Sequence, residues 1–288
     1  MKVGLIGSAQ NVAMHLEYWS TVPTIDVETV VIESQEDISL FHLVNDIDLV
    51  DLCVSEELME GVLERINSEV AILLTEVDSN IDKYKNIVKE NTLFRFATSM
   101  MCTPELTSLQ EQIKHKQLGR LGVHYVSLKS QQFLPVYRSF SHKEFSLLQW
   151  IVATFGALKT LYAKNINNRY ITTQIQLMDG SFIQLELARG FGKGELTIEL
   201  TGVAGMLSYS EEDTTPIKLT MNNGEEQVFR PLGKSILHRQ LQDAYHCFVQ
   251  GEQVFSNAEE INKTIQVIDA INQSIEQDEP MTNTGGCQ

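Results

Sequence analysis

The residues whose types and spacing suit a chemical role lie near the amino-terminus, behind two short apolar runs. Gly7 follows the first run, and Glu33 follows the second, 26 residues later. The residues that connect Gly7 to the next helical pattern are Ser8, Ala9, Gln10 and Asn11. Backbone N–H groups at such a strand–helix turn bind a pyrophosphate, and an acid about 20 residues later binds the adenosine ribose. The spacing therefore predicts a dinucleotide site at these residues.

This pattern departs from the usual dinucleotide fingerprint, Gly-x-Gly-x-x-Gly, whose glycines let the backbone approach the phosphates. Ala9 and Val12 stand at the second and third glycine positions, where their side chains add a methyl group and further bulk. An acid at Glu33 favours NAD over NADP, because it repels a 2′-phosphate. Two interpretations stay open: a cofactor site that prefers NAD, or a glycine that ends a strand near a solvated loop acid.

Strands and helices alternate through the first third of the chain. Short apolar runs predict strands at Lys2–Ile6, Val27–Ile32, Leu49–Val54, Val70–Leu74 and Leu93–Ala97. Apolar positions three or four apart predict helices at Asn11–Ser20, Glu36–Asn45, Glu56–Ile66 and Ile81–Glu90. This alternation is typical of a doubly wound parallel sheet. Ligands bind beyond the carboxyl ends of such strands, which adds Ser55 and Glu76 to the candidate cofactor site.

The pattern changes at Pro104, which opens a helix that ends near Gln117. The strands that follow, without helices between most of them, are Leu121–Leu128, Leu158–Lys164, Arg169–Met178, Ser181–Ala188, Gly194–Thr201, Gly205–Tyr209, Ile217–Met221 and Gln227–Phe229. Asp179-Gly180 predicts a two-residue hairpin turn, because glycine permits a positive φ. Asn222-Asn223-Gly224 predicts a second turn. The closing helices are expected at Ser235–Gln250 and Ala258–Glu276.

These elements predict two domains and a tail. Residues 1–118 form an α/β domain with a doubly wound parallel sheet, and residues 119–276 form an α+β domain built on a large sheet. Thr173, Ile175 and Leu177 alternate with glutamines, so one face of that sheet is expected to be apolar and the other polar. Residues 277–288 are polar and are expected to fray.

The charge balance excludes several classes of partner. The chain has 288 residues, with 38 Asp and Glu against 22 Lys and Arg, and a formal net charge of -16. Such a surface repels nucleic acid and anionic membranes, and no apolar run reaches the ~18–20 residues that span a bilayer. The 4 cysteines are far apart and the 7 histidines lack metal-ligand spacing. We therefore expect thiols in a reducing cytosol, a cytoplasmic location and no metal site.

Several segments in a fixed order carry a family resemblance. They are Val3–Gly7 with the helix around His15, Asp48–Val54, Leu118–Gly122, Phe155–Lys159, Phe248–Gly251 and Ser256–Glu260 with the helix Ile265–Ser274. Over nearly the full chain, this layout resembles the Gfo/Idh/MocA family of NAD(P)-dependent oxidoreductases. The resemblance implies an N-terminal Rossmann domain and a C-terminal domain with a mostly antiparallel sheet. It also implies NAD or NADP as cofactor, a small polar metabolite as substrate, and a homodimer formed through the C-terminal sheet.

The catalytic motifs of that family are incomplete here. The family's Glu-Lys-Pro is replaced by Glu76-Val77-Asp78, so the glutamate is kept and the lysine is lost. The family's Asp-x-x-x-His-x-x-Asp has neither its histidine nor its last aspartate, whichever register is chosen before Phe155-Gly156. Hydride transfer at a C–OH group needs a partner for the hydroxyl proton. The nearest groups able to exchange it are His142 and Lys143.

Other side chains complete a candidate substrate site, and each has a structural alternative. Tyr137, Arg138 and Tyr125 are expected to contact substrate, with the arginine suited to a carboxylate. The alternatives are an ordinary solvated helix start at His142–Glu144 and strand packing for His124 and Tyr125. Arg189, which follows a strand near Gly190 and Gly192, either faces a ligand or is an ordinary loop arginine. Two hypotheses therefore stand: an NAD(P)-dependent oxidoreductase, or a catalytically degenerate relative that binds a ligand or regulates a partner without chemistry.

Overall fold

The computed structural model describes residues 1–40, 46–66, 69–75, 94–96, 99–131, 140–213, 217–250 and 258–282. The chain divides into two compact units, Met1–Cys102 with Lys234–Asn262 and Thr103–Gly233 with Lys263–Gln288. These divisions differ from the single boundary expected at residue 118. The helix α5 (Pro104–Lys114) belongs to the second unit, where the indole Nε1 of Trp150 donates to the carbonyl oxygen of Leu106 at 3.2 Å. The chain also returns to the first unit after residue 233.

The first unit is built on a parallel sheet of five strands in the order β2-β1-β3-β4-β5. The strands are β1 (Lys2–Gly7), β2 (Asp26–Val31), β3 (Leu49–Cys53), β4 (Ala71–Leu74) and β5 (Phe94–Phe96). The helices are α1 (Ala9–Trp19), α2 (Gln35–Leu40) and α3 (Glu56–Leu63). Strands β3 and β4 are buried along their whole length, as their unbroken apolar sequences predict. The doubly wound, Rossmann-like prediction is confirmed, while the helix expected at 81–90 lies outside the described residues.

The first unit also includes a helix from near the end of the sequence. Helix α7 (Ile236–Tyr245) continues into a π-helical turn, His246–Gln250, so the expected helix from Ser235 to Gln250 changes its winding near its end. Leu241 and Ala244 of α7 belong to the same buried cluster as Val3, Leu5 and Trp19. The imidazole ring of His238 also lies edge-on to the phenol ring of Tyr18, with centroids 4.7 Å apart.

The second unit is built on a nine-stranded sheet in the order β13-β12-β11-β10-β6-β9-β8-β7-β14. Its strands are β6 (Leu121–Ser130), β7 (Leu158–Ile166), β8 (Tyr170–Leu177), β9 (Phe182–Arg189), β10 (Glu195–Gly202), β11 (Gly205–Ser210), β12 (Ile217–Met221), β13 (Glu226–Phe229) and β14 (Met281–Thr282). The neighbours β6 and β9 are parallel, and every other pair is antiparallel. The predicted mostly antiparallel α+β domain is confirmed.

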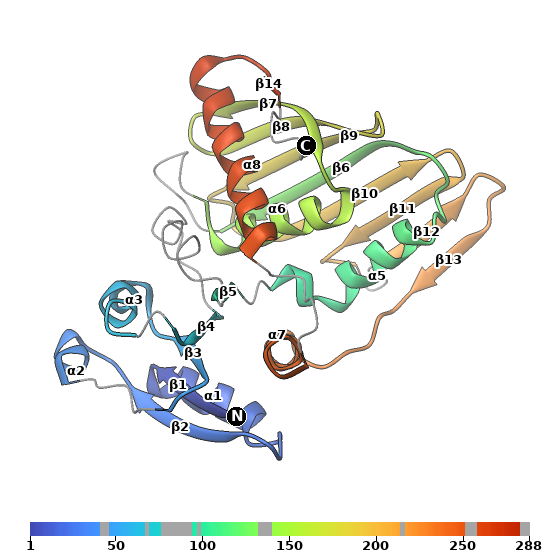
Figure 1. The fold of residues 1–288 in the computed structure, drawn as a ribbon. Coiled ribbons are helices and arrows are strands. Elements are labelled where there is room, and N and C mark those ends of the chain that lie inside the picture. Colours follow the sequence, from blue (N-terminus) through green and yellow to red (C-terminus); the bar gives the residue numbers. More distant parts are fainter. Residues whose placement is uncertain are drawn as a thin grey trace. The chain divides into compact units, whose positions relative to one another are not determined.

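One face of this sheet is covered by helices. Figure 1 shows α5, α6 (His142–Phe155) and α8 (Ala258–Gln277) on the same face. The buried side chains of β8 alternate as predicted, with Ile171, Thr173, Ile175 and Leu177 all buried. We call this the covered face, and the opposite one the open face. Strand β14 pairs with β7, so part of the segment expected to fray extends the sheet, and residues 283–288 lie outside the described part.

The predicted hairpin at Asp179-Gly180 forms with a longer turn. Leu177 N donates to Ser181 O at 2.9 Å, which leaves three residues in the loop, and Gly180 alone among them has a positive φ, of 88°. The Asp179 carboxylate accepts from the Ser181 amide at 2.9 Å, a bond that a two-residue turn does not provide. The turn at Gly224 has the same pattern, with φ of 86°. Among the described residues, no helix combines the length and apolarity needed to cross a membrane.

Candidate functional site

Gly7 ends β1 at the carboxyl edge of the parallel sheet, where the dinucleotide site was predicted. In register it lies between Val31 of β2 and Cys53 of β3. A Cβ on Gly7 would overlap the Sγ of Cys53 and lie 2.7 Å from its carbonyl oxygen. Real Cβ atoms do not approach this closely, so the packing of β3 against β1 by itself requires glycine here. The first fingerprint glycine thus has a structural explanation independent of any ligand.

Helix α1 begins at the same edge, and its first amides have specific partners. Ser8 is the N-cap, and its Oγ accepts from the Asn11 amide at 3.3 Å. The Asn11 side-chain Nδ2 donates to the carbonyl oxygen of Cys53 at 2.9 Å, which ties the helix start to β3. The Ala9 amide donates to Oε1 of Glu33 at 2.7 Å. These bonds place Ser8, Ala9, Asn11 and Glu33 together at one edge of the β1–α1–β2 unit.

The two residues that replace the fingerprint glycines differ in burial. Val12 is 6% exposed and belongs to the buried cluster of the first unit, so its bulk is directed inward. Ala9 is exposed at the helix start. Ser55 is the N-cap residue of α3 and is exposed, with no side-chain capping bond within the described part of the chain. Glu76 lies outside the described residues.

A buried polar network fixes α1 to the sheet below this edge. Asp51 is fully buried in the middle of β3, and its Oδ2 lies 2.8 Å from both His15 Nδ1 and Trp19 Nε1. The two partners are four residues apart and therefore lie on one face of α1. A buried carboxylate requires such partners, because its desolvation is costly. Sequence reasoning missed Asp51, although an acid within a continuous apolar run is a sign of a buried polar partner.

The backbone that carries Glu33 is also held in place. Oδ2 of Asp37, in the first turn of α2, accepts from the Glu33 amide at 2.9 Å and from the Ser34 amide at 2.8 Å. These hydrogen bonds to the charged form keep the pKa of Asp37 below its usual value. The Ile32 amide donates to the Gly7 carbonyl oxygen at 2.9 Å, which aligns the end of β2 with the end of β1.

In the second unit, α6 begins where the parallel strands β6 and β9 end. Ser141 and Glu144 form a capping box, with Ser141 N donating to Glu144 Oε2 at 2.8 Å. Arg189, the last residue of β9, donates through Nε to Glu144 Oε1 at 2.7 Å and through Nη2 to Oε2 at 3.0 Å. Each residue is 1% exposed. The interpretations of Arg189 as a loop arginine and of Glu144 as part of a solvated helix start are therefore wrong.

The predicted proton-transfer residues directly precede Glu144 of this buried ion pair. His142 and Lys143 are the first two residues of α6. Burial, together with the Lys143 charge, lowers the pKa of His142, so its imidazole is neutral at pH 7. Its Nε2 is buried without a hydrogen-bond partner in the described part of the chain, whereas Lys143 is exposed. Tyr137 and Arg138 lie outside the described residues.

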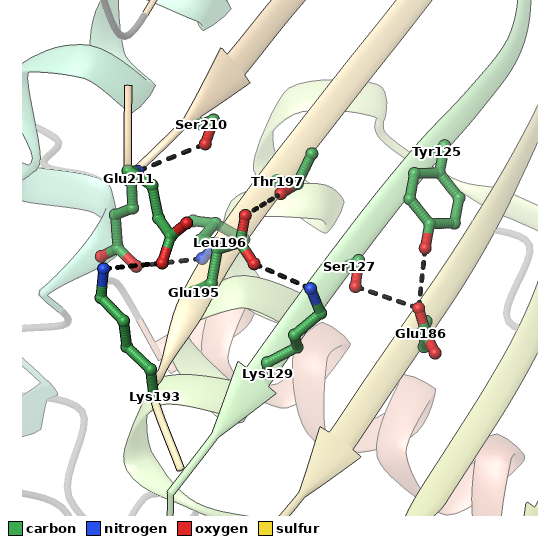
Figure 2. Close-up of polar contacts among 11 residues, drawn as sticks. Tyr125, Ser127, Lys129, Glu186, Lys193, Glu195, Leu196, Thr197, Ser210 and Glu211 are labelled. Atoms are coloured by element: carbon green, nitrogen blue, oxygen red, sulfur yellow. Dashed lines mark hydrogen bonds and ion pairs between the residues drawn. The ribbon is translucent and has the colours of Figure 1, made fainter. Parts of the chain in front are cut away.

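Tyr125 lies on the open face of the same sheet. Figure 2 shows it beside Ser127 and Lys129 of β6, and its hydroxyl donates to Glu186 Oε2 of β9 at 2.7 Å. Partial burial and this bond to Glu186 raise the pKa of Tyr125. Because α6 lies on the covered face, the structure does not bring Tyr125 together with His142.

His124 is buried on the covered face, as the strand-packing interpretation expects. It is 0% exposed, its Nδ1 accepts from the Thr201 amide at 3.3 Å, and its ring stacks on Phe155 with centroids 5.1 Å apart. Burial lowers the pKa of His124 to about 4. The described residues contain no group of three or more His, Cys, Asp or Glu side chains that could hold a metal ion.

The fold occurs in solved structures of oxidoreductases. No family model matches the sequence, and no curated protein matches it. A Desulfitobacterium hafniense oxidoreductase described as NADPH-dependent has a TM-score of 0.76 and 12% identity, covering 98% of this chain and 97% of that one. An Agrobacterium radiobacter oxidoreductase in complex with NAD+, L-tartaric acid and magnesium has a TM-score of 0.74 and 13% identity, with 98% of each chain covered. A myo-inositol dehydrogenase from Corynebacterium glutamicum has a TM-score of 0.72 and 12% identity, with 99% of each chain covered. At these identities the likeness is one of fold.

Proposed function

We propose that the chain is an NAD(P)-dependent oxidoreductase that acts on a small polar metabolite by hydride transfer. The observation that carries this proposal is the meeting of Ser8, Ala9 and Glu33 at the carboxyl edge of the parallel sheet. Ligands of doubly wound sheets bind at this edge. The solved structures of the same fold that hold NAD+ or are described as NADPH-dependent add independent support.

The donor set at this edge suits a dinucleotide. The start of α1 offers the Ser8 hydroxyl and the amides of Ala9 and Gln10 to a pyrophosphate, with Asn11 holding the helix start to β3. Val12 points into the core and leaves the edge clear. We assign Glu33 to the adenosine ribose, which favours NAD over NADP, and Ser55 and Glu76 to the nicotinamide half. Bound NAD(P) supplies or accepts the hydride.

The proton of the reaction is assigned to the start of α6. Oxidation of a C–OH group requires an acceptor for the hydroxyl proton, and a neutral imidazole at pH 7 is such an acceptor. We therefore propose His142 as the proton-transfer residue, with Lys143 as the alternative and Tyr137 and Arg138 as substrate-binding residues. Tyr125 remains outside this group, because it lies on the open face with Glu186.

A second candidate function is supported by the same edge. Gly7 is explained by its contact with Cys53 alone, and the sequence Glu76-Val77-Asp78 lacks the family's lysine. Both features are compatible with a catalytically degenerate relative that keeps the fold and binds a ligand or regulates a partner without catalysis. The two functions differ in whether dinucleotide binding is followed by hydride transfer.

We further propose a cytoplasmic homodimer formed through the open face of the nine-stranded sheet. This face carries paired charges such as Lys129 with Glu195, whose Nζ and Oε2 are 2.8 Å apart, and no helix covers it among the described residues (Figure 1). Sedimentation equilibrium of the wild-type chain and of Tyr125→Arg tests this proposal. A monomeric wild type, or a dimer unaffected by the arginine, would contradict it.

The test of the main proposal is thermal unfolding of the full chain with NADH or NADPH. A ligand at a hundred times its Kd stabilises the folded state by about 2.7 kcal/mol, which gives a clear rise in Tm. We expect a rise with NADH and a smaller one with NADPH. No rise with either cofactor up to millimolar concentration would refute the oxidoreductase. A rise without turnover of any polyol or hydroxy acid would favour the non-catalytic alternative.

A further inference from the structure

The positive end of α1 is neutralised by a residue from outside the helix. The partial positive charge at a helix N-terminus attracts anions, and helices usually place acids in their own first turn. The helices α2, α5 and α6 do so with Glu36 and Asp37, Glu105 and Glu144. Helix α1 has no acid in its first turn. Its counter-anion is Glu33, 24 residues away in sequence, whose Oε1 accepts from the Ala9 amide at 2.7 Å.

Backbone hydrogen bonds on both sides of Glu33 hold the residue next to the Ala9 amide. Asp37 fixes the backbone of Glu33 and Ser34, and the Ile32–Gly7 hydrogen bond fixes the strand end before it. Both Glu33 and Ala9 are exposed, so a ligand from solvent can reach the contact. The carboxylate therefore occupies an accessible amide donor of the phosphate-binding edge, and an incoming anion competes with it directly.

From this competition we propose that Glu33 is a specificity-determining residue that excludes simple phosphate anions from the start of α1. The inference rests on the proposed function, because it concerns the same edge. An anion without a ribose must displace the carboxylate and leave it beside a like charge. A dinucleotide displaces it too, but its ribose hydroxyls give the carboxylate new hydrogen-bond donors. Glu33 thus couples phosphate binding to the presence of a nucleoside.

The variant Glu33→Gln separates these two effects. Its amide oxygen still accepts from Ala9, but the negative charge is lost. We expect the variant to bind inorganic pyrophosphate about two- to fivefold more tightly than the wild type, the range expected for an exposed carboxylate at a helix N-terminus. The affinity for NADH should rise by a smaller factor, because the bond from a charged acceptor to the ribose is lost. The affinity for NADPH should rise more than that for NADH.

The measurement is calorimetric titration of the full chain with inorganic pyrophosphate, NADH and NADPH. The matched control is Glu36→Gln, which removes one charge from an exposed side chain in the first turn of α2. Amide spectra of the 15N-labelled chain add a direct readout, since pyrophosphate should shift the Ala9 resonance more strongly in Glu33→Gln.

The outcomes distinguish this inference from the function it rests on. If the wild type binds NADH while Glu33→Gln binds pyrophosphate no more tightly than the wild type, the exclusion role is wrong and the cofactor site stands. If Glu36→Gln gains as much as Glu33→Gln, the effect is one of net charge and the inference is overturned. If neither the wild type nor Glu33→Gln binds pyrophosphate or a dinucleotide, both proposals fail.

Discussion

The N-termini of helices α1 and α6 are neutralised in opposite ways. At α6 the acid is local and buried: Glu144 caps its own helix and pairs with Arg189, both 1% exposed. At α1 the acid is distant and exposed, and a single bond joins Glu33 to Ala9. The buried anchor cannot exchange partners without loss of stability, whereas the exposed one can. We therefore regard the Glu144–Arg189 pair as the scaffold beneath the proposed proton-transfer residues, and the Glu33–Ala9 contact as part of a binding surface.

Arg189→Ala tests the buried anchor and should have the largest effect. Removing one partner of a buried ion pair leaves an uncompensated charge, which typically costs ~3–5 kcal/mol of unfolding free energy. Urea unfolding measured by circular dichroism checks this value. The control is Lys193→Ala, which breaks the exposed Lys193–Glu212 pair and should leave the midpoint unchanged. Equal midpoints for the two variants would show that the buried pair is not the scaffold we describe.

Asp51→Ala tests whether α1 is held to the sheet by its buried bonds to Asp51 rather than by the exposed contact at its N-terminus. The substitution leaves the buried donors of His15 and Trp19 without their acceptor, and an unsatisfied buried donor costs about 1–3 kcal/mol. A loss of ~2–4 kcal/mol is expected in the same urea assay. The control is Asp26→Ala, which removes an exposed carboxylate at the start of the neighbouring strand β2. A loss below 1 kcal/mol would mean that Asp51 is not the anchor.

Acid should weaken the second unit through His124. Its folded-state pKa of about 4 lies below the ordinary value, so the unfolded chain takes up a proton more readily. The stability that depends on neutral His124 is therefore fully present above pH ~6.5. As the pH falls towards ~4, the free energy of unfolding decreases by up to about 3 kcal/mol. His124→Asn keeps an acceptor for the Thr201 amide and should lose less stability between pH 7 and pH 4. Parallel acid profiles for the wild type and the variant would contradict this assignment.

Glu33→Gln should have the smallest effect on stability. The bond at the exposed start of α1 survives with a neutral acceptor, so the expected loss is about 0.3–1 kcal/mol at low salt. The loss should shrink further in high salt, because exposed charges are screened. A loss comparable to that of Arg189→Ala would remove the distinction between scaffold and binding surface on which the comparison rests.

Local patterns predicted the elements well, because their periodicity reports burial directly. Strands β1 to β5, and the strands from β6 to β13, lie within a few residues of their expected positions. The hairpin at Asp179-Gly180 was predicted, but its length depended on the Asp179 side chain, which also bonds Ser181. Turn length is set by such side-chain bonds as much as by the glycine.

Long-range pairings were harder to predict from one sequence. Arg189 and Glu144 are separated by 45 residues, and nothing in either local pattern shows that the other is near. The same holds for Asp51 and His15, which are 36 residues apart. The edge at Gly7, Ser8 and Glu33 was predicted as a group because doubly wound topology places strand ends together. That Glu33 would bind Ala9 itself was not visible in the sequence.

The return of α7 to the first unit has a consequence for how this protein is made. Leu241 and Ala244 complete the buried cluster of the β1–α1–β3 layer, so that core lacks two of its members until most of the chain has left the ribosome. The second unit is also discontinuous, because Lys263–Gln288 returns to it after α7, so its core too is completed only by the end of the chain. A fragment ending near residue 118 would expose apolar surface on α1 and invite aggregation, whereas residues 1–102 joined by a short linker to 234–262 would carry the complete first core.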